Sequence, residues 1–156
     1  MPKLDYFHDP AAPPANSIVV AASAFVTDDA NRVLLIKRSD NGLWAIPGGA
    51  QDVGESITAT AVRETLEETG IHIEIIGLVG IYSDPQHVIA YDDGEVRQEF
   101  SICFRGRPIG GAISTSSEST RVEWVDRERV GDLRIHPSVQ LRIEHGFERQ
   151  AQPYLG

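Results

Sequence analysis

Residues 48–71 carry the most restrictive pattern in this 156-residue chain, a glycine-rich turn followed by an acidic helix. The segment reads GGAQDVGESITATAVRETLEETGI. An α-helix has about 3.6 residues per turn, so Glu64, Glu67 and Glu68 stand at i, i+3 and i+4 and share one face. The roughly opposite face, predicted to pack on a core, carries Thr58, Val62, Leu66 and Thr69.

Three carboxylates on one helical face repel one another unless a cation neutralises them. Like charges at this spacing cost roughly 0.2–0.5 kcal/mol per pair. Oxygen-only ligands favour a hard divalent ion, Mg²⁺ or Mn²⁺, over zinc. The simpler interpretation is a solvated face of a surface helix, which is what a charge run usually means.

The spacing of these residues resembles the Nudix box, G-x5-E-x7-R-E-U-x-E-E-x-G-U, in which U is aliphatic. The charged and glycine positions of that pattern are filled here by Gly49, Glu55, Arg63, Glu64, Glu67, Glu68 and Gly70. The one departure is Thr65, where the family usually has an aliphatic residue. A β-branched threonine can still pack at the edge of the apolar stripe. The resemblance implies the Nudix fold, an α/β (α+β) domain with a mixed β-sheet sandwiched between helices.

The resemblance also implies a reaction, the attack of water on a phosphorus of a nucleoside diphosphate linked to another group. The expected cofactor is Mg²⁺, with Mn²⁺ as a substitute, and Glu67 and Glu68 would be its ligands. Glu64 would be a ligand or the residue that orients or deprotonates the water. The backbone carbonyl of Gly48 matches a position that often completes the metal shell in the family.

Other residues are expected to support the box or to extend it. Glu55 and Arg63 would pair and hold the loop against the helix. Nudix enzymes often need another acid outside the box, at a variable position. Glu118 is the candidate, because it lies in a Ser-rich loop shortly before a predicted strand, and Glu99 is the second choice.

Residues that bind the substrate are less constrained by the sequence. The candidates are Trp44, Arg38, Arg97 and Tyr91. Arginine suits bidentate recognition of phosphate, and tyrosine can stack on a base. Each has a simpler interpretation, as a core residue for Trp44 and as surface charges for the arginines. The substrate class stays open between ADP-ribose or another nucleoside diphosphate sugar and a noncanonical nucleoside triphosphate.

Two other functional classes remain alternatives. A non-catalytic, nucleotide-sensing Nudix domain would typically have lost box carboxylates, whereas Glu64, Glu67 and Glu68 are all present. An interaction protein with a merely acidic helix would not be stabilised by divalent ions.

Composition excludes several partners. The net charge of −9, from 14 basic and 23 acidic residues, argues against nonspecific binding to nucleic acid or to anionic membranes. No apolar stretch approaches the roughly 18 residues of a membrane span, and the N-terminal residues lack a signal-peptide pattern. We therefore expect a cytoplasmic protein, with a homodimer expected only by analogy with the family. The single cysteine, Cys103, is predicted to be a buried structural thiol.

The order of predicted elements indicates one Nudix domain at 17–147, preceded by an arm of little regular structure at 1–16 and followed by a tail at 148–156. The box helix is predicted from about Glu55 to Thr69, with Gly70 ending it. Strands at 17–26 and 33–38 are expected to form a hairpin. The remaining predictions are strands at 71–81, 100–105 and 121–125, loops at 83–95 and 107–119, and a helix at 137–147.

Overall fold

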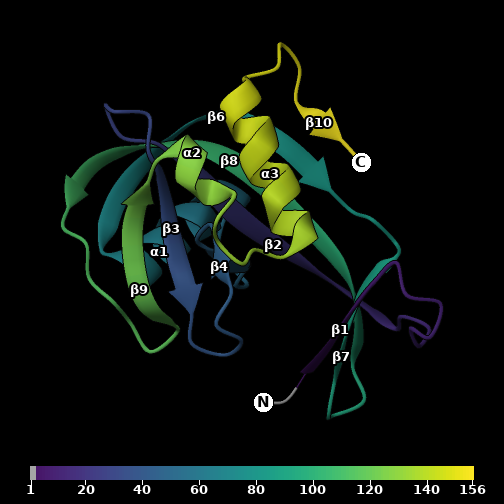
Figure 1. Cartoon of the computed structure of the whole chain (residues 1–156). Helices are drawn as coiled ribbons and strands as arrows, with labels where there is room; N and C mark the ends of the chain where they lie inside the picture. The colour runs from purple at the N-terminus through teal and green to yellow at the C-terminus, as the bar shows by residue number, and fades with distance from the viewer. Residues whose placement is uncertain (1–2) are drawn as a thin grey trace.

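The computed structural model describes residues 3–156, and its strands form two sheets accompanied by three helices (Figure 1). The larger sheet has the order β1-β7-β8-β2-β5, and β6 pairs with β8 and with β10; the smaller sheet has the order β4-β3-β9. In chain order the elements are β1 Lys3–Phe7, β2 Ser17–Val26, β3 Val33–Arg38, β4 Trp44–Ala45, β5 Gly48–Ala50, α1 Ile57–Thr69, β6 Ile71–Tyr82, β7 His87–Tyr91, β8 Val96–Gly111, β9 Ser119–Val125, α2 Arg127–Val130, α3 Pro137–Glu148 and β10 Tyr154–Leu155.

Strand β2 contacts helices on both faces of the larger sheet. It pairs in parallel with β8 along its whole length and antiparallel with β5. Its second half, residues 22–26, is buried throughout, which suits a strand covered on both faces, whereas its first half is partly exposed. Ala22 packs with Ala61 of α1, whereas Phe25 points to the other face and packs with Ile143 of α3. The predicted fold class, a mixed sheet between helices, is confirmed.

Helix α1 ends where the sequence predicted but turns a different face to the core. Ser56 caps its first turn by accepting a hydrogen bond from the Ala59 N–H, and Gly70 ends it with φ 77°. The predicted core face was wrong for Thr58 and Leu66, which are exposed. The buried residues of the helix are Thr60, Ala61, Thr65, Glu68 and Thr69. Small side chains on this face allow the helix to lie close to the sheet, and they bring Glu68 inward with it.

The predicted hairpin of β2 and β3 is wrong. Strand β3 belongs to the smaller sheet, where it pairs with β4 and β9. The backbone pairing between the end of β2 and β3 is a single isolated bridge, from Thr27 to Val33. The physical reason is that both edges of β2 are already paired, one with β8 and the other with β5.

Regular structure extends further than the sequence predicted at the N-terminal side. Strand β1 pairs antiparallel with β7, from Lys3↔Tyr91 to Phe7↔His87. The expectation of little regular structure in the arm was therefore wrong over Lys3–Phe7, and the loop predicted at 83–95 contains β7; residues 1–2 lie outside the described residues. Strand β7 also pairs with the start of β8, so β1 is an edge strand whose ladder hydrogen bonds come from β7. The two form a ribbon, here called the wing, that projects from the body (Figure 1).

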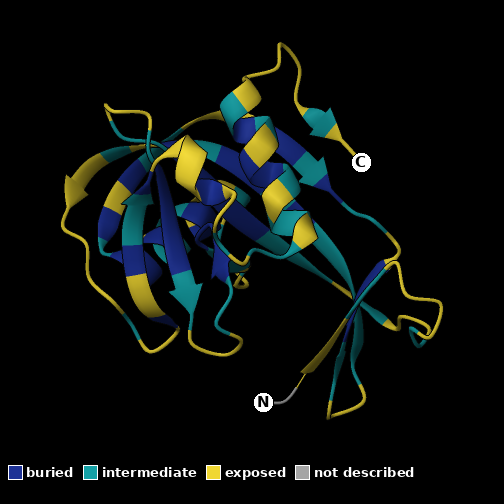
Figure 2. Cartoon of the chain, viewed as in Figure 1, coloured by how far each residue is buried: buried dark blue, intermediate teal, exposed yellow. Residues whose placement is uncertain are grey.

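Strand β8 is also longer than predicted, and it reaches Gly111 inside the loop predicted at 107–119. Strand β10 lies in the predicted tail and pairs in parallel with β6. Buried residues concentrate in the strands and helices of the body, while the turns are exposed (Figure 2). Cys103 is a free, fully buried thiol, as predicted. Across the described residues, helix length and hydropathy together rule out a membrane-crossing helix.

Candidate active site

Three carboxylates from two separate segments converge beside α1. Glu64 and Glu68 belong to the helix, and Glu118 lies in the loop before β9; their oxygen atoms lie within 4.8 Å of one another. Hydrogen bonds fix this loop on both sides. Ser119 Oγ donates to the Glu68 carbonyl at 2.8 Å, and the Ser39 N–H donates to the Glu118 carbonyl at 3.0 Å. Glu118, the acid predicted outside the box, thus lies beside two of the box glutamates.

The cluster is electrostatically costly without a cation. Burial raises the pKa of Glu68 to about 8, with a further increase from the charges of Glu64 and Glu118, while a hydrogen bond from the Gly48 N–H opposes the shift. Burial also raises the pKa of Glu64, against the effect of Arg63. All the converging donors are carboxylate oxygens, which fits a hard divalent ion such as Mg²⁺.

The turn before the helix approaches the cluster through its glycines. The Gly48 N–H donates to Glu68 Oε1 at 2.8 Å, which orients that carboxylate. A Cβ atom placed on Gly49 would lie 2.5 Å from the Glu64 carboxyl carbon and from one of its oxygens. Only glycine leaves room for the Glu64 side chain at this position. The ligand role of the Gly48 carbonyl stays a prediction.

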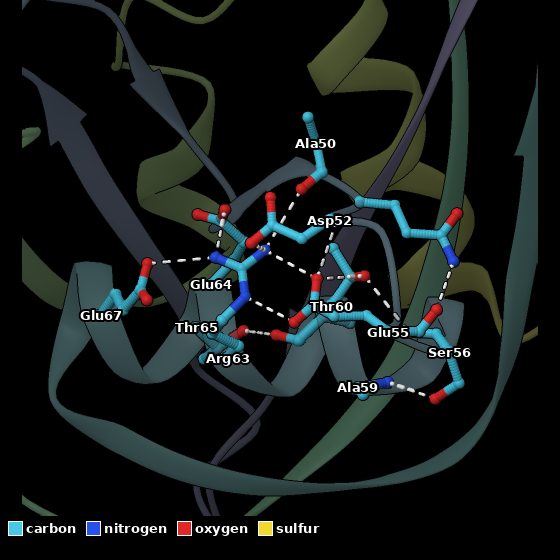
Figure 3. Close-up of polar contacts among 12 residues, drawn as sticks. Ala50, Asp52, Glu55, Ser56, Ala59, Thr60, Arg63, Glu64, Thr65 and Glu67 are labelled. Carbon is cyan, nitrogen blue, oxygen red and sulfur yellow. Dashed lines mark hydrogen bonds and ion pairs between the residues drawn. The ribbon is translucent and has the colours of Figure 1, made fainter.

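Arg63 lies at the centre of a polar network that joins the turn to the helix (Figure 3). Its Nε donates to Glu55 Oε2 at 2.6 Å, and its Nη1 donates to Glu64 Oε1 at 2.9 Å. Its Nη2 donates to the Ala50 carbonyl at 3.2 Å. The hydrogen bonds from Arg63 lower the pKa of Glu55 to about 2. The pair expected from the sequence is present, and it also holds Glu64.

Glu67 stands apart from the three converging carboxylates. Its side chain is 58% exposed and accepts a hydrogen bond from Arg63 Nη1 at 3.3 Å. This contact is drawn at the outer side of the helix in Figure 3. The role of Glu67 as a metal ligand stays a prediction.

Among the predicted substrate residues, Arg38 lies nearest the acidic cluster. Its guanidinium donates two hydrogen bonds to Asp40, at 2.9 and 2.8 Å. Those bonds raise the pKa of Arg38, and the charges of Glu68 and Glu118 raise it further. Trp44 is buried in the core, which agrees with its simpler interpretation.

Arg97 and Tyr91, the other two predicted substrate residues, contact each other. Tyr91 belongs to the wing, and Arg97 lies in the adjoining strand β8. The Arg97 guanidinium lies over the Tyr91 ring, 4.7 Å from its centroid, and is also bound by Glu95 through two hydrogen bonds. A role for Arg97, Tyr91 or Trp44 in substrate binding stays a prediction.

A second cluster, formed by Asp5, His87 and His136, was not predicted from the sequence. Asp5 Oδ1 lies 3.1 Å from His87 Nε2 and 3.3 Å from His136 Nε2. Partial burial would raise the pKa of Asp5, but the hydrogen bonds from His136 and His87 outweigh it and lower that pKa. The imidazole rings of His87 and His136 are stacked, with centroids 5.0 Å apart and an angle of 11° between their planes, and both present Nε2 to the same Asp5 oxygen. No sequence spacing signals this cluster, because the three residues come from distant segments.

A mixed sheet between helices, with helix carboxylates gathered against a glycine turn, is the arrangement of a class of phosphoanhydride hydrolases that typically depend on a divalent metal. The family model of the NUDIX domain matches residues 18–143, and the chain belongs to the Nudix family of pyrophosphohydrolases.

Several proteins are similar to this chain across most of its length. A MutT-like protein of Streptomyces ambofaciens is 36% identical over 121 residues, which cover 78% of this chain and 71% of that protein. A putative 8-oxo-dGTP diphosphatase of Bacillus subtilis is 34% identical over 132 residues, covering 84% and 80%. An ADP-ribose pyrophosphatase of Methanocaldococcus jannaschii is 35% identical over 122 residues, covering 73% and 65%. The substrates named for these relatives differ.

Solved structures show the same fold. The crystal structure of a NUDIX hydrolase from Nitrosomonas europaea has a TM-score of 0.71 and 25% identity, covering 90% of this chain and 78% of that one. The NUDIX domain of Shewanella oneidensis NrtR, in complex with ADP ribose, has a TM-score of 0.63 and 25% identity, covering 90% and 92%.

Proposed function

We propose that this protein is a Mg²⁺-dependent hydrolase of the pyrophosphate linkage in a nucleoside diphosphate derivative, either ADP-ribose or another nucleoside diphosphate sugar, or a noncanonical nucleoside triphosphate. The observation that carries the proposal is the convergence of Glu64, Glu68 and Glu118. The substrates named for the similar proteins from Bacillus subtilis and Methanocaldococcus jannaschii support both options.

The roles of the carboxylates follow from how each is held. When bound, the divalent ion offsets the negative charge of the phosphates and polarises the phosphorus toward attack. Glu68 would be the fixed ligand, because it is buried and oriented by the Gly48 N–H. Glu64 would be a second ligand, oriented by Arg63. Glu67 would add a ligand oxygen by turning toward the cluster, since its exposed side chain is held by Arg63 Nη1 through one oxygen.

Glu118 is the proposed general base. It is exposed to solvent, yet a carboxylate oxygen lies within 4.8 Å of those of Glu64 and Glu68. A base in this position can accept the proton of an attacking water that is held beside the other two carboxylates. Arg38 would contact a substrate phosphate by exchanging its Asp40 partner for phosphate oxygens, which suits the planar guanidinium.

The test is a panel of nucleoside diphosphate derivatives and triphosphates incubated with protein and Mg²⁺, with identification of the products. We expect turnover of one class, and a loss of on the order of 10²–10⁴-fold in kcat for Glu118→Gln under saturating Mg²⁺. Glu68→Gln should abolish both turnover and the rise in melting temperature with Mg²⁺. Glu144→Gln, on the exposed side of α3, is the matched control.

Each outcome addresses a separate part of the proposal. Unchanged turnover in Glu118→Gln would remove the base role from that residue. Tight nucleotide binding without turnover anywhere in the panel would favour the sensing domain instead. Absence of any Mg²⁺ effect on melting would contradict the metal site itself.

A further inference from the structure

A cavity separate from the acidic cluster lies between α3, the end of β6 and the wing. Its lining residues come from β1, β6, β7, β8, α3 and β10, from the turn after β6 and from Gly156 beyond β10; α1 and the Glu118 loop contribute none. It encloses about 70 Å³. Since a water molecule needs roughly 10–15 Å³, the cavity has room for several waters or one small ion.

Arg142 is the most unusual residue in this cavity. Only 7% of it is exposed, and its guanidinium lies over the Tyr82 ring, 4.6 Å from the centroid. Its Nη1 donates to the Ser138 carbonyl at 2.8 Å, while its buried Nε has no hydrogen-bond partner. Among the residues that the structure describes, no carboxylate forms an ion pair with it. A buried cation without a carboxylate partner is expensive, so an anion in the cavity beside the guanidinium would be favoured.

The acidic residues of the same cavity restrict what that anion can be. Asp84 is already engaged, because it accepts hydrogen bonds from the Gln86 N–H at 2.9 Å and is paired with His8 Nε2 at 2.6 Å. His87, which also lines the cavity, is directed to Asp5. Glu99 lines the cavity without pairing with Arg142. An ionised carboxylate only accepts hydrogen bonds, so a ligand beside Glu99 must carry a donor.

We propose that this cavity binds a hydrogenphosphate ion, with phosphate oxygens against Arg142 and the P–OH group donating to Glu99. The ion combines an acceptor face for the guanidinium with a donor for the carboxylate. Sulfate at neutral pH has the same shape and no proton, so Glu99 repels it. A phosphate monoester has a second pKa of about 6 and has lost its proton at pH 7.5, whereas inorganic phosphate retains one. The site therefore selects free phosphate over both.

The experiment is isothermal titration calorimetry of the metal-free protein in EDTA at pH 7.5 and constant ionic strength. Inorganic phosphate should bind at one site, with sulfate at least about tenfold weaker because the carboxylate faces an unprotonated oxyanion. Methyl phosphate, a monoester arm with the smallest substituent, should bind weakly at pH 7.5 and approach phosphate at pH 5.5. Arg142→Gln should lose phosphate binding, and Glu99→Gln should reduce the preference for phosphate over sulfate to less than about threefold.

Arg129→Gln and Glu144→Gln are matched controls outside the cavity and should bind phosphate like the parent protein. Equal affinity for phosphate and sulfate, or no phosphate binding, would overturn the proposal. If Arg142→Gln fails to fold by circular dichroism, Glu99→Gln decides, because an unchanged preference for phosphate in that variant is incompatible with the assigned hydrogen bond. The result is independent of nucleotide hydrolysis, since the titration contains neither Mg²⁺ nor a nucleotide.

Discussion

At the scale of single residues, the acidic site depends on the absence of a side chain at Gly49. The sequence identified Gly49 through the spacing of the box, but only the structure gives its physical reason, the 2.5 Å approach of the Glu64 carboxylate to the place of a Cβ atom. Neither Gly49 nor Glu64 alone signals this contact. Their relation depends on the packing of the turn of β5 against α1, which a one-dimensional pattern does not contain.

Gly49→Ala should therefore displace the Glu64 carboxylate while leaving the fold intact. We expect a loss on the order of 10²-fold in kcat, as for a small misplacement of a catalytic group, together with weaker Mg²⁺ binding. Steady-state kinetics and metal titration measure both. Gly131→Ala is the control, because a Cβ there meets nothing within 4 Å. A kcat equal to that of the control would contradict the steric argument.

The Glu55–Arg63 pair predicts a specific dependence of stability on pH. The pKa of Glu55 is lowered from 4.5 to about 2, so the folded state favours its ionised form. The pair contributes stability above pH 4.5 and loses that contribution as the pH falls toward 2. Urea unfolding should show Glu55→Gln less stable than the parent at pH 7, with the difference shrinking between pH 4.5 and 2. A difference that stays constant over this window, relative to Glu144→Gln, would exclude the linkage.

At the scale of elements, the sequence predicted where α1 lies but not how it is rotated. Helical periodicity and Gly70 fixed its extent, while the expected core face placed Leu66 inward. Leu66 is 44% exposed, and the buried stripe runs through Ala61, Thr65 and Thr69, of which only Thr69 lay on the predicted core face. The apolar character of a side chain did not predict its burial here. The buried face of α1 requires small side chains, and it must also bring Glu68 to the turn. The departure from the box at Thr65 consequently falls at a fully buried position.

Thr65→Val should be tolerated and is expected to stabilise the protein by up to about 1 kcal/mol. The buried Thr65 hydroxyl donates to the Ala61 carbonyl at 2.7 Å, one turn earlier in the same helix, so little is lost when it is replaced by a methyl group. Urea unfolding at pH 7 measures the change. Destabilisation by more than about 1 kcal/mol would mean that the hydroxyl has a role beyond this local bond.

At the scale of the whole molecule, the least predictable features are those that join distant segments. Glu118 was placed near the box by its position in the chain relative to a predicted strand. The wing was missed because β1 and β7 are short, and their pairing joins residues from 80 to 88 positions apart, from Phe7↔His87 to Lys3↔Tyr91. Asp5 connects the wing to α3, because it contacts His136, the N-cap residue of that helix. His136 Nδ1 accepts a hydrogen bond from the Ser138 N–H.

Asp5→Ala should loosen the wing without disturbing the core. Removing the shared acceptor of His87 and His136 is expected to lower the opening free energy of β1 by about 1 kcal/mol. Hydrogen exchange of the β1 and β7 amides should quicken by about fivefold, while that of β2 is unchanged. Asp92→Ala, in the exposed turn between β7 and β8, is the control. Exchange rates equal to those of the control would show that Asp5 does not anchor the wing.

The pairing of strand β8 with three neighbours restricts where residues can be inserted into the chain or deleted from it. It runs through 16 residues, pairing with β2 along ten of them, with β7 near its start and with β6 over its second half. Deleting one residue inside it would move the following side chains to the opposite face and misalign more than one neighbour at once. Insertions and deletions should therefore be confined to the turns at its two ends. The loop that carries Glu118 is the connection at one of these ends, so the surface beside the acidic cluster can vary in length while the sheet beneath it cannot.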